Sequence, residues 1–232
     1  GEENRHYRLR NYLSRDCDNY PTHELGPISK ILDIHHGNRM VSLVSMSSAA
    51  MGLNEYVRNE KGPDSKLANR AFIQGDLVTT IIKCARGETI MLELDTCLPR
   101  YYSRKFTVHG TKGMYSEDGD LLFLDNLYPE EEHFTWQKKH FGNAEDYAKE
   151  FNSDIWKDFK NQIRGGHGGM DWLMLRDVVE RFKAGREPAI DVYEAAAWMS
   201  ICPLTEASIA IGGMPMAIPD FTGGKWVACS QI

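Results

Sequence analysis

The residues from 76 to 96, DLVTTIIKCARGETIMLELDT, hold the pattern that decides the fold of this chain. Two runs rich in β-branched and aliphatic residues, Asp76–Cys84 and Glu88–Thr96, flank the short segment Ala85-Arg86-Gly87. Two such runs joined by a short segment that contains glycine are typical of a β-hairpin. The stretch therefore predicts two neighbouring antiparallel strands.

Further strands are predicted on both sides of this hairpin. Met40–Met46 precedes it. After it, Lys105–His109 and Met114–Tyr115 flank the turn-forming segment Gly110-Thr111-Lys112-Gly113, and Leu121–Leu124 follows. Because short turns join most of these strands, the middle of the chain predicts an antiparallel sheet.

Helices are predicted mainly in the last third of the chain. Ala144–Phe159 and Met170–Lys183 show helical periodicity, and Val192–Ile211 is the most apolar helical segment. Asp191 is the expected N-cap of this last helix, and Pro203 is expected to kink or divide it.

The amino-terminal part predicts a strand over residues 5–12 and a helix from Pro27 to His36, which Gly37 and Asn38 would stop. Strands joined by short turns and then helices predict an α+β fold, with one antiparallel sheet covered by helices.

The composition argues against several classes of function. The 232 residues have the hydrophobic content (42%) and charged content (26%) of an ordinary soluble globular domain. A net charge of −6 argues against nucleic acid and anionic membranes as partners, because both favour a basic patch. The most apolar segment, Ala195 to Ile211, falls short of the ~20 apolar residues that a membrane span needs.

Cofactor and metal patterns are missing from the sequence. The five cysteines include no C-x-x-C pair and the histidines have no metal-ligand spacing, so we expect no metal site and no disulfide scaffold. No strand runs into a G-x-G-x-x-G turn, and there is no G-x-x-x-x-G-K-[ST] segment. The chain therefore holds neither of these phosphate-binding loops.

The segment Asn19-Tyr20-Pro21-Thr22-His23 places a phenol and an imidazole three residues apart at the predicted entrance to a helix. An imidazole titrates near neutral pH, and a phenol can hydrogen-bond sugar hydroxyls or relay protons. A helix N-terminus favours the neutral imidazole, which can act as a base. The alternatives are a surface or structural histidine and a half-buried tyrosine.

Two later segments could also contact a ligand. Tyr101-Tyr102-Ser103-Arg104 lies between two predicted strands, where exposed aromatic rings and guanidinium groups suit carbohydrate and suit a protein interface equally well. His167 stands between two Gly-Gly pairs before a helix. Such a loop either needs positive φ angles or holds the imidazole against a ligand. Asp171 favours the first turn of the following helix.

These motifs occur together in the order of a known family: Tyr20-Pro21-Thr22-His23, Leu25-Gly26-Pro27, Leu98-Pro99-Arg100 with Tyr102-Ser103-Arg104, Gly110-Thr111-Lys112-Gly113, Gly166-His167-Gly168-Gly169-Met170-Asp171 and Pro219-Asp220-Phe221-Thr222. The ordered set resembles the C-terminal domain of glycoside hydrolase family 109. This family is the NAD-dependent α-N-acetylgalactosaminidase-like branch of the Gfo/Idh/MocA oxidoreductases. The similarity spans nearly the whole chain.

The resemblance implies a two-domain enzyme with an N-terminal Rossmann domain that holds NAD. Residues 1–232 would be a single C-terminal domain for substrate binding and oligomerisation, with an open, mainly antiparallel sheet and helices on one face. The implied reaction oxidises the third carbon of a glycoside or amino sugar, and a base then removes a proton from the neighbouring carbon. The glycosidic oxygen leaves, water adds and the hydride returns, so the net reaction is hydrolysis.

The resemblance also implies roles for individual residues. Tyr20 would contact substrate and nicotinamide, and the segment Tyr20-Pro21-Thr22-His23 would line the sugar pocket. His23 would perform acid–base chemistry, and Tyr102 would contact substrate. Arg8 would bind substrate if the alignment has no gap, with Arg10 as the other choice. His167 belongs to a family motif and is assigned to substrate binding.

Two positions depart from the family pattern, which commonly has glycine where Glu24 stands and proline where Tyr101 stands. A carboxylate beside His23 would favour the imidazolium form. These departures bear on the particular sugar and on the net reaction.

Three functions follow as expectations: the substrate-binding half of an NAD-dependent glycosidase, the same half of a sugar dehydrogenase with net oxidation, or a non-catalytic carbohydrate-binding or assembly module. We expect a homo-oligomer through the open sheet face and negligible catalysis by the isolated chain. Cytoplasmic or exported location would depend on the segment upstream of Gly1.

Overall fold

The computed structural model describes residues 6–95, 97–125, 127, 140–159 and 164–228. The chain divides into two compact units, each of which is described by itself. The first unit comprises Gly1–Arg100 and Ile190–Ile232, and the second comprises Tyr101–Ala189.

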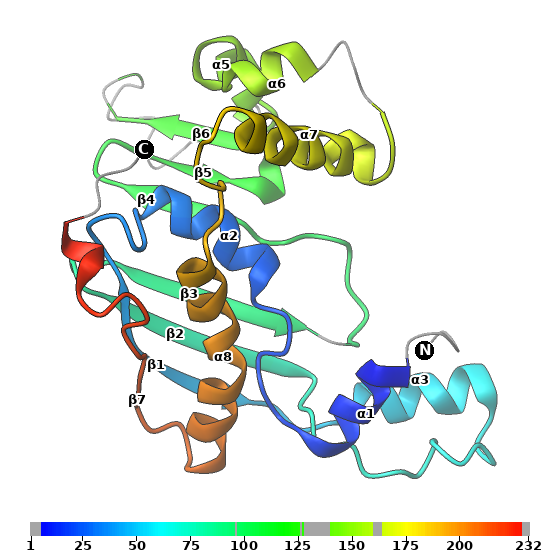
Figure 1. The fold of residues 1–232 in the computed structure, drawn as a ribbon. Coiled ribbons are helices and arrows are strands. Elements are labelled where there is room, and N and C mark those ends of the chain that lie inside the picture. Colours follow the sequence, from blue (N-terminus) through cyan, green and yellow to red (C-terminus); the bar gives the residue numbers. More distant parts are fainter. Residues whose placement is uncertain (1–5, 96, 126, 128–139, 160–163, 229–232) are drawn as a thin grey trace. The chain divides into compact units, whose positions relative to one another are not determined.

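The first unit contains a four-stranded antiparallel sheet with the strand order β3-β2-β1-β7 (Figure 1). Its strands are β1 (Met40–Ser47), β2 (Leu77–Cys84), β3 (Thr89–Asp95) and β7 (Met216–Ala217). The predicted hairpin is confirmed as β2 and β3. Gly87 lies in the connecting turn with a φ of 110°, a conformation that glycine adopts without steric cost.

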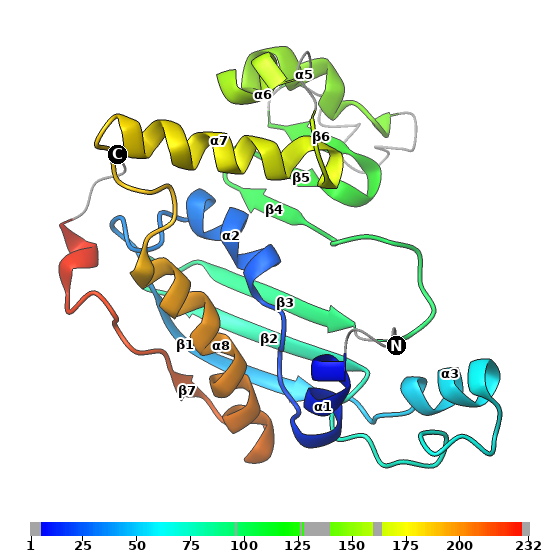
Figure 2. The same ribbon diagram turned by 45° about the vertical axis from the view of Figure 1, so that its right-hand side comes forward.

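Helices of the first unit are α1 (His6–Ser14), α2 (Thr22–Ile31), α3 (Gly52–Lys61) and α8 (Val192–Ala210), with a 3-10 turn at Lys225–Val227. Helices α2 and α8 lie on the same face of the sheet (Figures 1 and 2). The side chains of β2 alternate between buried and exposed, so that Val78 and Ile82 point toward these helices and Ile81 points away. The core therefore lies between the two helices and one face of the sheet.

Trp198 is the largest side chain in this core. It is 5% exposed and packs in the cluster with Leu25 of α2 and Leu43 of β1. Its indole N–H donates a hydrogen bond of 2.7 Å to the hydroxyl of Ser29 on α2. Burial of an aromatic side chain together with a satisfied polar atom fixes the packing of α2 on α8.

The second unit contains a three-stranded antiparallel sheet with the order β4-β5-β6. Its strands are β4 (Thr107–Gly110), β5 (Gly113–Ser116) and β6 (Leu121–Leu124). Its helices are α5 (Ala144–Phe151), α6 (Asp154–Phe159) and α7 (Met170–Lys183), with 3-10 turns at Glu117–Gly119 and His167–Gly169. The Asn143 side chain, before α5, bonds both the N–H and the C=O of Leu122 in β6 at 2.8 Å, which ties α5 to the sheet.

The α+β class is confirmed, while the strands form two sheets where the sequence predicted one. Residues 6–14 are helical, so the predicted strand over 5–12 is wrong for its described part. The helix predicted from Pro27 to His36 begins earlier and ends earlier, because Asp33 and His35 have positive φ angles of 53° and 68°. The helix predicted from Ala144 to Phe159 is interrupted after Phe151.

Helix α8 begins as predicted and continues through Pro203 without being divided. Asp191 is its N-cap in a complete capping box, in which the Asp191 side chain accepts from Glu194 N–H and the Glu194 side chain accepts from Asp191 N–H. A proline leaves the carbonyl four residues earlier without its helical donor. That residue is Met199, which is exposed, as is Pro203 itself. The break in the hydrogen-bond pattern therefore lies on the solvent side.

Candidate functional site

The side chain of Gln74, which is 1% exposed, holds the loop that leads into α2 through hydrogen bonds. The Gln74 Oε1 atom accepts from Cys17 N–H at 3.4 Å and from the Asn19 side-chain amide at 3.0 Å. The Gln74 Nε2 atom donates to the Cys17 carbonyl at 3.0 Å. One buried amide thus satisfies both polar groups of the Cys17 backbone and fixes the path of the loop.

Asp18 holds the same loop through two further hydrogen bonds. Its backbone N–H donates to the hydroxyl of Thr205 on α8 at 3.0 Å, and its Oδ1 atom accepts from Tyr20 N–H at 3.3 Å. Asp18 is fully buried. Tyr20 is therefore held at the end of a loop that is bonded to the core helix α8 and to Gln74.

Tyr20 and His23 form a stacked pair at the start of α2. Their ring centroids are 4.7 Å apart with an interplanar angle of 28°, and the Tyr20 hydroxyl lies 3.5 Å from His23 Nε2. Both side chains are exposed, and Tyr20 retains 46% of its accessible surface. Hydrogen bonds of catalytic groups are often long in structures without ligand and shorten when ligand binds. The two side chains are close enough to exchange a proton with each other, and both are accessible to a bound molecule.

Arg8 of α1 completes this group. Its guanidinium carbon lies 5.5 Å from the centroid of the Tyr20 ring and 5.8 Å from that of Tyr7. A hydrogen bond from its Nε to the Tyr7 hydroxyl (3.1 Å) raises the pKa of Arg8. The structure thus brings Arg8, Tyr20 and His23 together. This arrangement favours Arg8 over Arg10 as the arginine of the site.

The two residues between Tyr20 and His23 differ in exposure. Pro21 is buried and Thr22 is half-buried. The Pro21 carbonyl accepts from Leu25 N–H at 2.9 Å, which closes the first turn of α2. Pro21 therefore shapes the turn that presents Tyr20 and His23, and Thr22 offers only part of its surface to a ligand.

Glu24 is directed into the fold. Among the described residues, neither its Oε2 atom nor the Oδ2 atom of Asp18 has a hydrogen-bond partner, although both atoms are buried. Burial, with a contribution from the charge of Asp18, raises the pKa of Glu24 to about 8, and burial raises the pKa of Asp18 to about 6. Glu24 is therefore mainly neutral at pH 7. A neutral Glu24 carries no charge that could favour the imidazolium form of His23, so that expectation does not apply at pH 7.

This burial of Glu24 gives a pH-dependent stability. Its pKa rises from an ordinary value of 4.5 to about 8 on folding, so the folded state binds the proton more tightly. Stability from this group is greatest below pH 4.5 and declines as the pH rises toward 8. We expect Glu24→Gln to be more stable than the wild type at pH 9 by on the order of 2 kcal/mol and nearly equal to it at pH 4.

Urea unfolding at both pH values measures this difference. Glu60→Gln is the matched control, because Glu60 is exposed on α3 and its substitution should change stability little at either pH. A Glu24→Gln variant that tracks the wild type at every pH would show that Glu24 ionises freely in the folded state.

Tyr102 belongs to the second unit and is 85% exposed. Its two neighbours are both bonded to one carboxylate: the Tyr101 hydroxyl donates to Asp118 Oδ2 at 3.2 Å, and the Ser103 hydroxyl donates to Asp118 Oδ1. Because Tyr101 and Ser103 are tied down, the loop presents the Tyr102 ring to solvent. Tyr101, which departs from the family pattern, thus has a structural contact of its own.

His167 also belongs to the second unit and is exposed. Its Nδ1 atom lies 2.8 and 3.0 Å from the two carboxylate oxygens of Asp171. The glycine-rich loop does contain positive φ angles, at Gly165, His167, Gly168 and Gly169. Positive φ angles therefore explain the glycines at positions 165, 168 and 169, but they do not explain why a histidine stands at position 167.

Other histidines and tryptophans differ in their burial. His35 is 5% exposed, and burial lowers its pKa. Trp198 lies in the core, whereas Trp156 is 43% exposed. Within the described ranges, no group of three or more His, Cys, Asp or Glu side chains is arranged to hold a metal ion. None of the helices in this part of the chain has the length and apolar character needed to cross a membrane.

Comparison with known proteins decides the family. The model of the glycosyl hydrolase 109 C-terminal domain matches residues 1–228. This chain belongs to glycosyl hydrolase family 109. The motifs around Tyr20, Tyr102 and His167 therefore lie in a glycosyl hydrolase 109 C-terminal domain.

Relatives of this family 109 chain include longer curated proteins. An α-N-acetylgalactosaminidase of Tannerella forsythia is 36% identical over 223 residues, which are 95% of this chain and 46% of the relative. A glycosyl hydrolase family 109 protein of Parabacteroides distasonis has the same identity and coverage. The family 109 chain thus spans about half the length of these relatives.

The fold of the family 109 chain also has a match among solved structures. An oxidoreductase domain protein from Kribbella flavida superimposes with a TM-score of 0.50 at 16% sequence identity, over 86% of this chain and 51% of that protein. At this identity the match concerns the fold alone. It agrees with the α+β fold expected of an oxidoreductase C-terminal domain.

Sequence reasoning missed two residues that build the site. Gln74 and Asp18 are polar positions whose roles depend on contacts with distant segments, and no local pattern marks them. The one signal was their position in the sequence: Asp18 directly precedes the Asn19–His23 segment, and Gln74 lies two residues before Asp76, where the hairpin begins.

Proposed function

We propose that this chain is the substrate-binding part of an NAD-dependent glycosidase that acts as an α-N-acetylgalactosaminidase. The observation that carries the proposal is the stacked Tyr20–His23 pair, held by buried contacts and exposed at the start of α2, in a chain of family 109. The Tannerella forsythia relative named α-N-acetylgalactosaminidase supports the choice of substrate.

NAD, when bound, would take a hydride from the third carbon of the sugar and return it at the end of the reaction. The chain fits only a small part of this cofactor. Its sequence lacks the G-x-G-x-x-G loop, while the exposed ring of Tyr20 offers one flat face to a nicotinamide. We therefore propose that an N-terminal Rossmann domain of the longer protein holds most of the cofactor.

The residues of this chain would bind the sugar and move protons. His23 Nε2 removes the proton from the carbon next to the ketone, and the Tyr20 hydroxyl shares that proton through its contact with Nε2. The glycosidic bond then breaks by elimination, and water adds to the resulting double bond. Arg8 binds sugar hydroxyls. In the second unit, the exposed ring of Tyr102 offers a flat apolar face of the kind that covers a sugar ring.

The first experiment tests whether the proposed reaction takes place. We expect the longer protein that contains this chain, supplied with NAD, to cleave an aryl α-N-acetylgalactosaminide without lasting NADH absorbance. We expect the isolated 232-residue chain to show negligible turnover under the same conditions, because its sequence lacks the G-x-G-x-x-G loop. Lasting NADH accumulation would instead indicate a sugar dehydrogenase, and turnover by the isolated chain would contradict the division of roles.

We also propose that the chain forms a homo-oligomer through the open face of its four-stranded sheet. On this face, Ile81 of β2 lies between Val44 of β1 and Met91 of β3 in the strand register. Ile81 is 47% exposed and Met91 is 74% exposed. An apolar patch in the middle of a sheet face is typical of a surface that another protein covers.

An oligomer of this kind should be sensitive to a charge at its centre. We expect Ile81→Glu to lower the mass measured by analytical ultracentrifugation to that of a monomer. Ile73→Glu is the matched control, since Ile73 is similarly exposed (53%) but lies outside the strands. A wild-type protein that is monomeric well above micromolar concentration would contradict the proposal.

A further inference from the structure

Among the described residues, Arg8 has a phenol and not a carboxylate as its hydrogen-bond partner. Arg15, for comparison, forms an ion pair with Glu206. The guanidinium of Arg8 lies over two aromatic rings, with its central carbon 5.8 Å from the centroid of Tyr7 and 5.5 Å from that of Tyr20. Tyr20 belongs to the proposed site, so the second ring raises the question of what Tyr7 does there.

The contact between Tyr7 and Arg8 joins two neighbours on a helix. Successive residues of an α-helix point in directions about 100° apart and do not face each other. The Arg8 Nε atom nevertheless donates to the Tyr7 hydroxyl at 3.1 Å. Both side chains must therefore bend toward the same side of α1, and the position of the guanidinium over the Tyr20 ring shows that this is the side of the proposed site.

Burial does not explain the position of Tyr7. Its side chain is 58% exposed, and it lies outside the core cluster of the first unit. Tyr12 on the same helix has a structural role, because it is half-buried and its carbonyl accepts from the N–H groups of Ile73 and Gln74. A tyrosine that serves packing buries its ring and bonds its hydroxyl inside the fold. Tyr7 instead bonds its hydroxyl to Arg8 at the surface.

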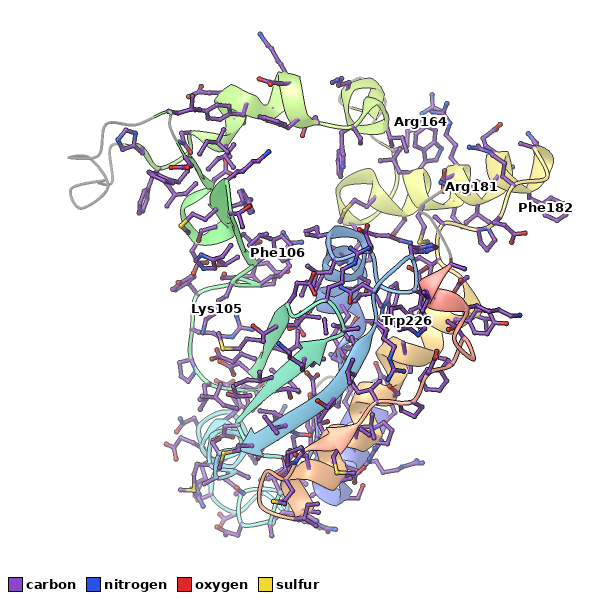
Figure 3. The ribbon with its side chains drawn as sticks, turned by 90° about the vertical axis from the view of Figure 1, so that its left-hand side faces the viewer. Lys105, Phe106, Arg164, Arg181, Phe182 and Trp226 are labelled. Atoms are coloured by element: carbon purple, nitrogen blue, oxygen red, sulfur yellow. The ribbon has the colours of Figure 1, made fainter. Side chains whose placement is uncertain are left out.

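The described C-terminal segment lies at the other end of α2 from these side chains. It contains Trp226, which is labelled in Figure 3, and the Trp226 carbonyl accepts from Gly37 N–H at 2.7 Å. Gly37 follows the C-terminal end of α2, whereas Tyr20 precedes its N-terminal end. The segment around Trp226 therefore does not cover the exposed surface of Tyr7.

A guanidinium that is held at Nε keeps the N–H donors of both terminal nitrogens for other partners. Within the described ranges, the terminal nitrogens of Arg8 donate no hydrogen bond. These two nitrogens form a planar fork, which suits a pair of neighbouring oxygen atoms on a ligand. The bond to Tyr7 limits rotation of this fork, so part of the conformational entropy that ligand binding would cost is already lost on folding.

We propose that Tyr7 is a positioning residue of this site, whose hydroxyl holds Arg8 Nε so that the terminal nitrogens of the guanidinium bind a pair of sugar hydroxyls. The assignment rests on the proposed function, in which Arg8 binds the sugar. Tyr7 acts through Arg8 and does not touch the reacting atoms. An interaction that is equally strong in the bound substrate and in the transition state lowers KM and leaves kcat unchanged. Loss of the Tyr7 hydroxyl should therefore appear in KM.

The first test is independent of turnover and uses NMR of the ¹⁵N-labelled 232-residue chain. We expect the Arg8 Nε–H proton to exchange with water about 5-fold faster in Tyr7→Phe than in the wild type, because the substitution keeps the ring and removes the acceptor. Tyr56→Phe is the matched control. Tyr56 is exposed on α3, and its hydroxyl makes no hydrogen bond in the described part of the chain, so the Arg8 signal should stay the same. Equal exchange in Tyr7→Phe and the wild type would overturn the proposal.

The second test measures KM and kcat of the longer protein on the aryl α-N-acetylgalactosaminide. We expect Tyr7→Phe to raise KM about 5-fold with kcat unchanged, and Tyr56→Phe to change neither. We expect Tyr7→Phe to have no further effect in an Arg8→Met background, because methionine has no donor for the Tyr7 hydroxyl to hold.

The outcomes separate the two proposals. A wild type without glycosidase activity would overturn the proposed function, while the exchange measurement still decides whether Tyr7 holds Arg8. An active wild type with an unchanged KM in Tyr7→Phe would overturn the assignment of Tyr7 alone. The same increase in KM in the Arg8→Met background would also overturn it, because Tyr7 would then act without Arg8.

Discussion

His23→Ala in the longer protein is expected to lower kcat/KM on an aryl α-N-acetylgalactosaminide by about 100-fold or more. The imidazole is exposed at the start of α2, and its Nε2 atom lies 3.5 Å from the Tyr20 hydroxyl. Removal of the ring takes away the proposed base and leaves the phenol without its proton partner. Steady-state kinetics with NAD present measures the loss.

Tyr20→Phe separates the two parts of the pair. It keeps the stacked ring and removes the hydroxyl, so the loss it causes reports on the proton contact rather than on packing. His109→Ala is the control, because His109 is exposed on β4 in the second unit and carries no proposed role. Full activity in both His23→Ala and Tyr20→Phe would remove these residues from the mechanism.

Trp198→Ala should cause the largest loss of stability, about 3–5 kcal/mol in the free energy of unfolding. The substitution empties the centre of the core between α2 and α8 and leaves the buried Ser29 hydroxyl without the indole donor. Urea unfolding of the 232-residue chain, followed by circular dichroism, measures the change.

Two further variants show which part of the effect comes from burial. Trp198→Phe should lose less, because the phenyl ring fills much of the same space and only the hydrogen bond and part of the volume disappear. Trp156→Ala removes an equally large side chain that is 43% exposed and should cost less than the buried change. Equal losses for Trp198→Ala and Trp156→Ala would show that the core is not organised around Trp198.

Segments with strong local signals were predicted well from the sequence. The β2–β3 hairpin follows from two β-rich runs around a glycine, and α7 has the predicted bounds Met170–Lys183. The capping box of Asp191 and Glu194 fixes the start of α8. In each of these segments the local preference and the tertiary structure agree, which is the condition under which patterns succeed.

Segments whose structure depends on distant contacts were predicted poorly. In α1, Leu9, Tyr12 and Leu13 are half-buried at helical spacing, but the polar residues between them also allow a strand pattern. The Tyr12 carbonyl accepts from the N–H groups of Ile73 and Gln74, so α1 is bonded to the segment before β2. No local pattern contains that information.

The candidate site shows the same division. The resemblance of short motifs to a family led to Tyr20, His23 and Tyr102, and the structure shows all three exposed. That Arg8 lies over the Tyr20 ring is known only from the position of α1 in the structure. The neutral state of Glu24 required knowledge of its burial, which the position next to an exposed histidine did not reveal.

The hydrogen bonds of Gln74 to Cys17 and Asn19 have a consequence for how ligand preference can change among proteins of this family. The Gln74 amide uses donor and acceptor at once, so a carboxylate of the same size would face the Cys17 carbonyl with a repulsive oxygen. Substitution of Gln74 is therefore expected to displace the loop that carries Tyr20, whereas the exposed side chains of Tyr20 and His23 can change without loss of these buried hydrogen bonds. Changes of ligand preference are thus expected at the exposed side chains, and Gln74 is expected to stay the same.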